Sequence, residues 1–274
     1  MTSAHWDEAQ AAAYREFRFE FPEKTLAGKT IIVAGGTGGL GAATAVLLAR
    51  EGARLVVGFR HDRARAERLQ AAIEREFKQK PALVEGDLSQ ASVRRSYIET
   101  AQHLGGPIAG AAIFSGDPAR VPLQDLDREA ILRSLESNYV GPVLLARDLG
   151  EAMEREAGGG IVLLTTMQAL AAFPSSLNYA APKAALVHAA RILAQQWNRV
   201  GVNVVAPGAT VAGMAAASVA AGKYDRHIAS GVITRFGRPE DVARAVRFLL
   251  EPDGYINGET LLVDGGLTLR RDRG

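Results

Sequence analysis

The chain of 274 residues contains no cysteine and no long apolar run. Without cysteine it has no disulfide, no thiolate nucleophile and no Cys-ligated zinc or iron–sulfur centre, which fits a reducing compartment. No apolar run approaches the ~18 residues of a membrane span. The first residues, MTSAHWDEAQ, lack the basic start and apolar block of a signal peptide. We therefore expect a cytoplasmic protein with no membrane partner.

The net charge is also small, at +2 from 32 Lys+Arg against 30 Asp+Glu, so the composition does not point to a nucleic-acid partner. The five histidines are scattered without the spacing of metal ligands, and we expect no metal site. A hydrophobic content of 47% indicates a globular chain, and the length allows one or two domains.

From Gly28 onward, short β-branched runs alternate with longer helical patterns, which is typical of parallel βαβ units. The expected strands are Thr30–Ala34, Arg54–Phe59, Ala82–Glu85, Ile108–Phe114, Gly160–Thr165, Val202–Ala206 and Glu259–Val263. The expected helices are Leu40–Glu51, Asp62–Gln79, Gln90–Leu104, Leu126–Glu156, Tyr179–Val200 and Glu240–Leu250. The sequence predicts one α/β domain over residues 28–274: a doubly wound, Rossmann-type parallel sheet of about seven strands with helices on both faces.

Residues 1–27 form an N-terminal extension with a predicted helix over Asp7–Phe17. The extension holds five of the chain's 17 aromatic residues: Trp6, Tyr14, Phe17, Phe19 and Phe21. Because aromatic side chains gain free energy by burial, we expect the extension to pack on the main domain or on a neighbouring subunit. A second irregular segment, the Ala/Gly-rich stretch 207–238, is long enough to suggest a functional lid.

The first predicted strand runs directly into a glycine-rich turn and then a helix. The turn consists of Gly35, Gly36, Thr37, Gly38, Gly39, Leu40 and Gly41. Glycines permit a tight turn and a close approach of the backbone to a pyrophosphate, and the helix N-terminus supplies free N–H groups. The turn is therefore a predicted dinucleotide-phosphate site.

This turn resembles the T-G-x-x-x-G-x-G motif of the short-chain dehydrogenase/reductase family, non-extended type. Gly35, Gly39 and Gly41 match its glycines, and Ala34 replaces its Thr. The likeness covers about residues 26–269 and includes the pairs Asp87-Leu88 and Pro207-Gly208. It implies an oxidoreductase that moves a hydride between a nicotinamide cofactor and a small carbonyl or alcohol substrate, assembled as a homodimer or homotetramer. Further cofactor contacts implied by the likeness are Thr37, Gly38, Leu40, Ser115, Gly116 and Thr210.

The end of the second strand bears on which nicotinamide cofactor is used. Phe59 stands where NAD-binding members carry an Asp, and Arg60 follows it. Without that acid, no carboxylate there would repel a 2′-phosphate. The guanidinium of Arg60 can donate charge-assisted hydrogen bonds to this phosphate, and Arg63 lies close by in the sequence. We interpret Arg65 and Arg68 as solvated surface residues. The predicted cofactor is NADP(H), and NAD(H) is the alternative.

Tyr179 and Lys183 lie four residues apart, which puts both on one face of a helix. An ammonium beside a phenol favours the phenolate and lowers its pKa toward the operating range, so this tyrosine could exchange a proton with a substrate oxygen. The segment Tyr179–Leu186 resembles the family's Y-x-A-S-K-A-A pattern. The likeness makes Tyr179 and Lys183 the proton-transfer pair and also places them against the cofactor.

Thr166, thirteen residues before Tyr179, stands where the family has a Ser that holds the substrate oxygen. Thr keeps the hydroxyl and adds a methyl group. Thr165 is the neighbouring alternative. Asn138 resembles the helix Asn that holds a water in the family's proton relay.

Three departures from the family pattern stand out. Ser115-Gly116 ends a segment where most members have N-N-A-G. Pro182 precedes Lys183 and, with Asn178 as N-cap, would be the fourth helical residue, at the cost of one early helix bond. Ala212 fills the usual place of a Thr. Besides an NADP(H)-dependent enzyme, two readings therefore stay open: an NAD-dependent alcohol dehydrogenase, and a non-catalytic relative that only binds cofactor.

Overall fold

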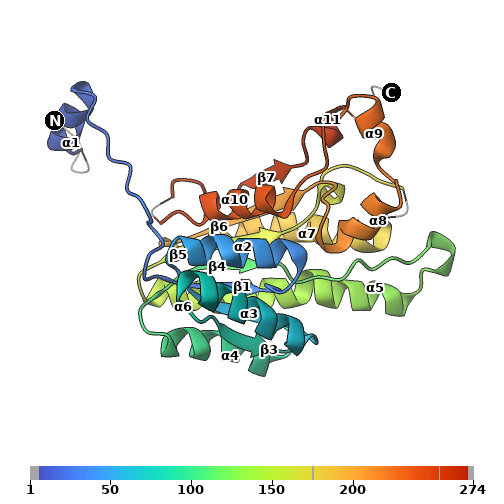
Figure 1. The fold of residues 1–274 in the computed structure, drawn as a ribbon, viewed down its shortest axis with the longest axis horizontal. Helices are drawn as coiled ribbons and strands as arrows, with labels where there is room; N and C mark the ends of the chain where they lie inside the picture. Colours follow the sequence, from blue (N-terminus) through green and yellow to red (C-terminus); the bar gives the residue numbers. More distant parts are fainter. Residues whose placement is uncertain (1–5, 175, 253, 271–274) are drawn as a thin grey trace.

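Seven parallel strands form one twisted sheet at the centre of the molecule (Figure 1). The computed structural model describes residues 6–174, 176–252 and 254–270. The strand order is β3-β2-β1-β4-β5-β6-β7, so the chain winds outward from β1 to one edge and then from β4 to the other. The order reverses between β1 and β4, and doubly wound sheets bind their ligands at that point, beyond the carboxyl ends of the strands.

The strands agree closely with those expected from the alternating pattern, which confirms the predicted fold class. They are β1 Thr30–Ala34, β2 Arg54–Phe59, β3 Ala82–Glu85, β4 Ile108–Ile113, β5 Gly159–Leu164, β6 Val200–Pro207 and β7 Thr260–Val263. β1, with burial on both faces, carries no polar residue except Thr30, because helices cover it on each side.

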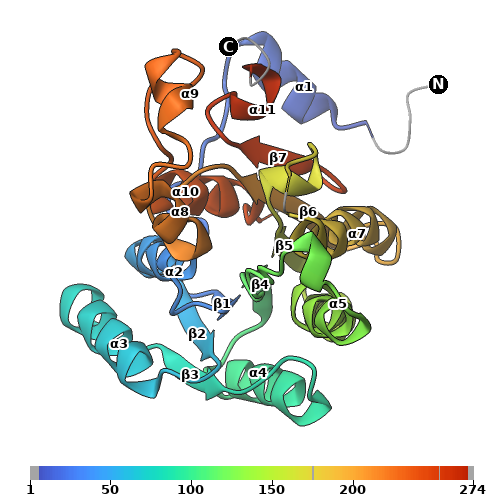
Figure 2. The ribbon, with the colours of Figure 1, turned by 90° about the vertical axis from the view of Figure 1, so that its right-hand side faces the viewer.

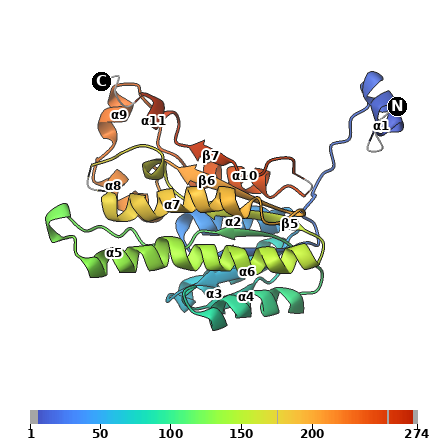
Figure 3. The ribbon, with the colours of Figure 1, turned by 180° about the vertical axis from the view of Figure 1, so that it is seen from behind.

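Helices cover both faces of the sheet, as the end-on view in Figure 2 shows. On one face lie α2 Gly39–Arg50, α3 Arg63–Phe77 and α10 Pro239–Leu249. On the other lie α4 Ala91–His103, α5 Arg128–Leu135, α6 Gly141–Arg155 and α7 Leu177–Leu193, visible from behind in Figure 3. The short elements are α1 Glu8–Arg15, α8 Ala216–Ala220, α9 Asp225–Ala229, α11 Leu267–Arg270 and the 3₁₀ turns Leu123–Asp125, Met167–Ala169 and Gly213–Ala215.

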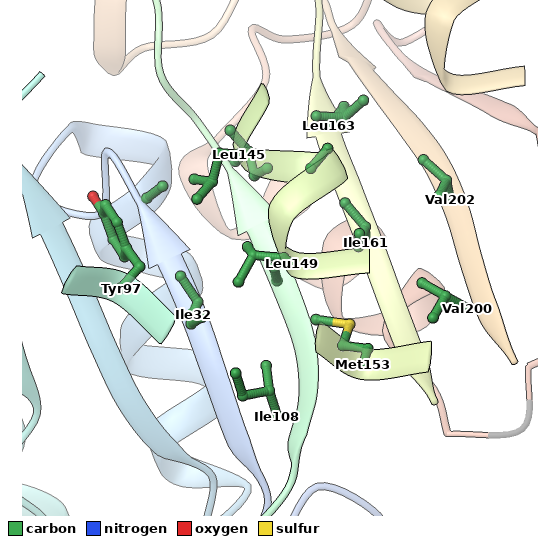
Figure 4. Close-up of a cluster of buried hydrophobic side chains, with 14 of the residues drawn as sticks. Ile32, Tyr97, Ile108, Leu145, Leu149, Met153, Ile161, Leu163, Val200 and Val202 are labelled. Atoms are coloured by element: carbon green, nitrogen blue, oxygen red, sulfur yellow. The ribbon is translucent and has the colours of Figure 1, made fainter. Parts of the chain in front are cut away.

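Each face of the sheet buries its own apolar cluster. Between the sheet and α6, Leu145, Leu149 and Met153 pack on Ile108 and Ile161 (Figure 4). Full burial of such side chains stabilises the fold by roughly 1.5–3 kcal/mol each. The two cores hold the strands rigidly, so the strand ends form a fixed platform for the site.

The single helix expected over Leu126–Glu156 is wrong in one respect. A π-helical turn, Glu136–Val140, separates α5 from α6. Pro142 lacks the N–H that would bond the carbonyl of Asn138, four residues earlier, and a wider turn accommodates that missing bond. The turn contains Asn138, so the proline shapes the backbone at a candidate site residue.

The expected limits of α7 also need correction. The helix begins at Leu177 with Ser176 as its N-cap residue, and it ends at Leu193 instead of Val200. Asn178 is therefore the second helical residue and Pro182 the sixth. Pro182 lies beyond the first turn, where a proline removes a hydrogen bond that the helix would otherwise make.

The N-terminal extension lies away from the sheet, with α1 at the end of a long connection (Figure 1). All five of its aromatic side chains are exposed, and Tyr14 stacks only on Phe19, with ring centroids 5.5 Å apart. The expectation that the extension packs on its own domain is wrong, whereas packing on a second subunit stays a prediction. The compact body begins near Leu26, which is fully buried.

Within the described part of the chain, no helix is both long and apolar enough to cross a membrane.

Candidate active site

Two cavities meet beyond the carboxyl ends of the strands. The first, of about 670 Å³, lies over the glycine turn and the ends of β2 and β4. The second, of about 640 Å³, lies between the end of β5, the start of α7 and the segment after β6. Both are lined by Leu40, Leu164, Ala212 and Met214, so they adjoin, and we refer to the two together as the cleft.

The glycine turn fits a phosphate because its backbone is packed too closely for side chains. Gly35 has a left-handed φ of 71°, and a Cβ there would lie 3.1 Å from the backbone of Phe114 and Ser115. A Cβ on Gly41 would lie 2.5 Å from the carbonyl oxygen of Gly35. The first turn of α2 carries no acidic residue and no side-chain cap. Its N–H groups and positive dipole end therefore face the cavity without an internal anion.

The far end of the first cavity is basic. Arg60 lines it and forms an ion pair of 2.6 Å with Asp87. Arg65, in the first turn of α3, borders the same cavity and is exposed, as expected for a solvated surface residue. Arg63 instead pairs with Glu85 and lies over the ring of Phe59. The basic partner of Arg60 at this end is therefore Arg65 and not Arg63.

Tyr97 also lines the first cavity, from α4. A Cβ on Gly58, in β2, would lie 1.6 Å from the hydroxyl oxygen of Tyr97. Only glycine at position 58 therefore leaves room for this phenol. Sequence reasoning missed Tyr97 because it lies mid-helix and outside any motif. Gly58, inside an otherwise apolar strand, was the available signal, because such a glycine often marks a close approach.

Tyr179 and Thr166 face each other in the second cavity. The nearby hydroxyl of Thr166 lowers the pKa of the tyrosine, but burial has the larger effect and raises that pKa to about 12. The expectation that the phenol's pKa would be lowered toward the operating range is therefore not met in this structure. Thr165, the neighbouring alternative to Thr166, also lines the second cavity, and its hydroxyl donates to the carbonyl of Lys183 at 2.9 Å.

Lys183 is buried beneath these residues, with an exposed fraction of 2%. Its ammonium donates to the carbonyl oxygens of Leu164 at 3.0 Å and Ser115 at 3.2 Å. Burial lowers its pKa to about 7. The amine and ammonium forms are thus close in free energy near neutral pH, which suits a group that gives and regains a proton.

Asn138 clamps the chain where β4 leaves the sheet. Its amide oxygen accepts from the N–H of Asp117 at 3.1 Å, and its amide nitrogen donates to the carbonyl of Asp117 at 3.0 Å. A Cβ on Gly116 would lie 2.6 Å from the Asn138 oxygen and 3.2 Å from the Lys183 nitrogen. Only glycine at position 116 lets these two side chains converge.

The segment after β6 forms the other wall of the cleft. Pro207, Gly208 and Thr210 line the second cavity, as the P-G match led us to expect. From the opposite wall, Arg120 donates to the carbonyl of Met214 at 2.7 Å and to the hydroxyl of Ser218 at 3.3 Å. Arg120 thus ties the expected lid segment to the loop after β4.

Nearly every residue predicted for the site lines the cleft. The exceptions are Asn138 and Lys183, which lie buried directly behind it. Lining the first cavity are Gly35, Thr37, Gly38, Gly39, Leu40, Gly41, Arg60, Asp87, Leu88, Ser115 and Gly116, and lining the second are Thr166, Tyr179, Pro207, Gly208 and Thr210. Residues far apart in the sequence are therefore brought to one cleft.

A seven-stranded doubly wound sheet with a glycine cradle at its switch point defines a dinucleotide-binding α/β protein. Comparison with known proteins narrows the class. Residues 34–268 match the family model described as enoyl-(acyl carrier protein) reductase. The chain belongs to the short-chain dehydrogenase/reductase family, whose members are oxidoreductases that bind a nicotinamide cofactor.

Individual relatives cover nearly the whole chain. The chain is 29% identical to NADPH-dependent aldehyde reductase 2 of Arabidopsis thaliana, over 90% of this chain and 97% of that one. It is 30% identical to a 3-oxoacyl-(acyl-carrier-protein) reductase of Aggregatibacter actinomycetemcomitans, over 87% of this chain and 99% of that one. A short-chain type dehydrogenase/reductase from Mycobacterium ulcerans has the same fold, with a TM-score of 0.83 and 23% identity over 89% of this chain and 91% of that one.

Proposed function

We propose that the protein is an NADP(H)-dependent reductase of small carbonyl compounds. The observation that carries the proposal is that Tyr179 and Thr166 both line one cavity, which shares four lining residues with the cavity over the glycine cradle. A phenol and a second hydroxyl directed at the same space can hold one carbonyl oxygen between them.

Each residue has a distinct task in this proposal. When bound, the nicotinamide supplies a hydride to the carbonyl carbon. Tyr179 donates its proton to the carbonyl oxygen, which completes the alcohol. Thr166 orients that oxygen. Lys183, poised near neutral pH, restores the proton to the tyrosine, and Asn138 keeps the neighbouring chain in place around it.

The basic end of the first cavity supports NADP(H) over NAD(H). Phe59 replaces the acid that would repel a 2′-phosphate, and Arg60 and Arg65 both border the space beyond it. The Arabidopsis relative carries NADPH dependence in its name, which agrees with this choice.

The second cavity favours a carbonyl substrate that also carries an anionic group. Arg120 and Lys223 both line it, and none of the described residues around it is an aspartate or glutamate. A carboxylate there would gain charge-assisted hydrogen bonds worth roughly 1.5–3 kcal/mol each, less where water screens them. We expect reduction of para-formylbenzoate to exceed that of its neutral analogue para-formylbenzamide by about tenfold in kcat/KM. Replacing both cations by alanine should abolish the difference.

Helices α5 and α7 support a homodimer or homotetramer. Exposed apolar side chains lie on both helices, including Ile131, Leu132, Leu177 and Ile192. Such a surface is typical of a subunit interface. The cytoplasmic location stays a prediction.

A panel of aldehydes and ketones tests the proposed function against both alternatives. Turnover with NADPH that exceeds turnover with NADH supports it. Faster alcohol oxidation with NAD would instead indicate the NAD-dependent dehydrogenase. Tight NADPH binding without single-turnover reduction of any carbonyl would indicate a protein that only binds cofactor.

A further inference from the structure

Helix α7 holds Tyr179 and Lys183, yet it contains a proline between them. Pro182 is the sixth helical residue, and its nitrogen carries no hydrogen. The helix therefore cannot form the bond that would join residue 182 to the carbonyl of Asn178. That carbonyl belongs to a residue that is 7% exposed, where an unpaired polar group is costly.

A side chain from another helix bonds this carbonyl instead. The hydroxyl of Ser134, in α5, donates a hydrogen bond to the Asn178 carbonyl oxygen. Ser134 is itself only 2% exposed. The Asn178 amide adds two bonds across the same gap, to the carbonyls of Ala119 at 3.2 Å and Ala130 at 3.4 Å. Hydrogen bonds thus join the start of α7 to α5 at the position where α7 lacks one of its own backbone hydrogen bonds.

The same hydroxyl oxygen reaches the candidate relay residue. The Asn138 amide nitrogen donates to Ser134 Oγ at 3.2 Å. A serine hydroxyl has one donor and two acceptor positions, so it can make both bonds at once. Ser134 therefore connects two parts of the site through hydrogen bonds. One bond goes to α7, which holds Tyr179, and the other comes from Asn138, whose amide also bonds Asp117.

We propose that Ser134 is a positioning residue that replaces the helix bond lost at Pro182 and so fixes Tyr179 and Lys183 relative to Asn138. Its catalytic consequence rests on the proposed function, while its pairing with Pro182 does not. Ser134 is not among the residues that line the second cavity, so we assign it no direct role toward the substrate. The dependence runs one way: Pro182 is tolerable because Ser134 bonds the carbonyl that the proline leaves without a helix bond.

A double-mutant cycle tests the pairing. Ser134→Ala leaves the Asn178 carbonyl unpaired, and Pro182→Ala restores an N–H that can reach it. We expect Ser134→Ala to lower kcat by about tenfold at saturating substrate with an unchanged Kd for NADPH. Ser134→Ala/Pro182→Ala should regain most of that loss, and Pro182→Ala alone should resemble the wild type. Ser96→Ala serves as a control, since Ser96 also bonds a carbonyl within its helix, on α4 and away from the site.

The outcomes separate cleanly. Wild-type kcat and melting temperature in Ser134→Ala would overturn the proposal, and so would a loss that Pro182→Ala leaves unrepaired. If Ser134→Ala does not fold, a folded and active double variant still demonstrates the pairing, and an unfolded double variant contradicts it. If the wild-type protein reduces no carbonyl, the proposed function fails, whereas the melting temperatures of the four proteins still decide the pairing.

Discussion

The two parts of the cleft differ in which atoms form them. At the carboxyl end of β1 the cleft is formed mainly by backbone, whereas at the start of α7 it is formed mainly by side chains. The glycine turn offers N–H groups and space, and a Cβ at Gly35 or Gly41 would collide with neighbouring backbone. The catalytic side that we propose instead relies on side chains: the hydroxyls of Tyr179 and Thr166 and the buried amine of Lys183. Cofactor affinity and chemistry should therefore respond to different substitutions, and each prediction below probes that separation.

The largest effect is expected at the proton donor. Tyr179→Phe keeps the ring and removes the phenol, so carbonyl turnover should fall by on the order of 10²-fold or more. NADPH binding should persist, because the cradle is untouched. Steady-state kinetics beside a fluorescence titration with NADPH measure both quantities. Tyr255→Phe, on a fully exposed ring, is the control. Near-normal turnover in Tyr179→Phe would refute the assignment.

Thr166 supplies the next test on the catalytic side. Thr166→Val keeps the shape and loses the hydroxyl that we propose orients the substrate oxygen, so kcat should fall by roughly 10- to 100-fold. Thr166→Ser keeps the hydroxyl and should retain or raise activity, because the extra methyl group is gone. Full activity of the Val variant would mean that another group orients the substrate oxygen.

On the cofactor side, Arg60→Ala should weaken NADPH binding by about 1–3 kcal/mol and change NADH binding little. The reason is that only NADPH carries the 2′-phosphate. Arg68→Ala, an exposed change on the same α3 helix, serves as the matched control. Isothermal titration with both cofactors measures the difference. Equal losses for the two cofactors would show that Arg60 acts through its ion pair with Asp87 instead.

Lys183 links the catalytic side to folding stability. Its pKa is about 7 in the folded protein and 10.5 in its ordinary state. Between these values the unfolded chain binds more protons, so the free energy of unfolding should rise as the pH increases from 7 to about 9.5. Denaturant titrations of the cofactor-free protein should show a smaller rise in Lys183→Met. Lys80→Met, at an exposed lysine, should keep the wild-type slope, and equal slopes in all three proteins would contradict burial as the cause.

The smallest effect on chemistry is expected from the extension. Deleting residues 2–24 removes five aromatic residues but leaves Thr25, which bonds Arg247 at 3.0 Å. We expect a lower oligomer mass by light scattering with kcat per subunit unchanged, because the extension lies away from the cleft. An unaltered mass would show that it does not bind a second subunit.

The sequence predicted the sheet and most of the cleft because those signals are local. Alternating apolar runs mark the strands, and the glycine turn, Tyr179 and Lys183 stand in recognisable spacings. Ser134 and Tyr97 were not found, because each contributes through a contact with residues distant in sequence. The pKa of Tyr179 was misjudged for a related reason: spacing shows that Lys183 is near, but burial of the phenol depends on the packed structure.

The separation of binding from chemistry is tested most directly by assaying Tyr179→Phe and Arg60→Ala together, each for NADPH affinity and for single-turnover reduction at saturating NADPH. We expect Tyr179→Phe to lose the reduction and keep the affinity. Arg60→Ala should lose affinity and keep the single-turnover rate. If either variant loses both properties, the two sides of the cleft do not act independently and the account is contradicted.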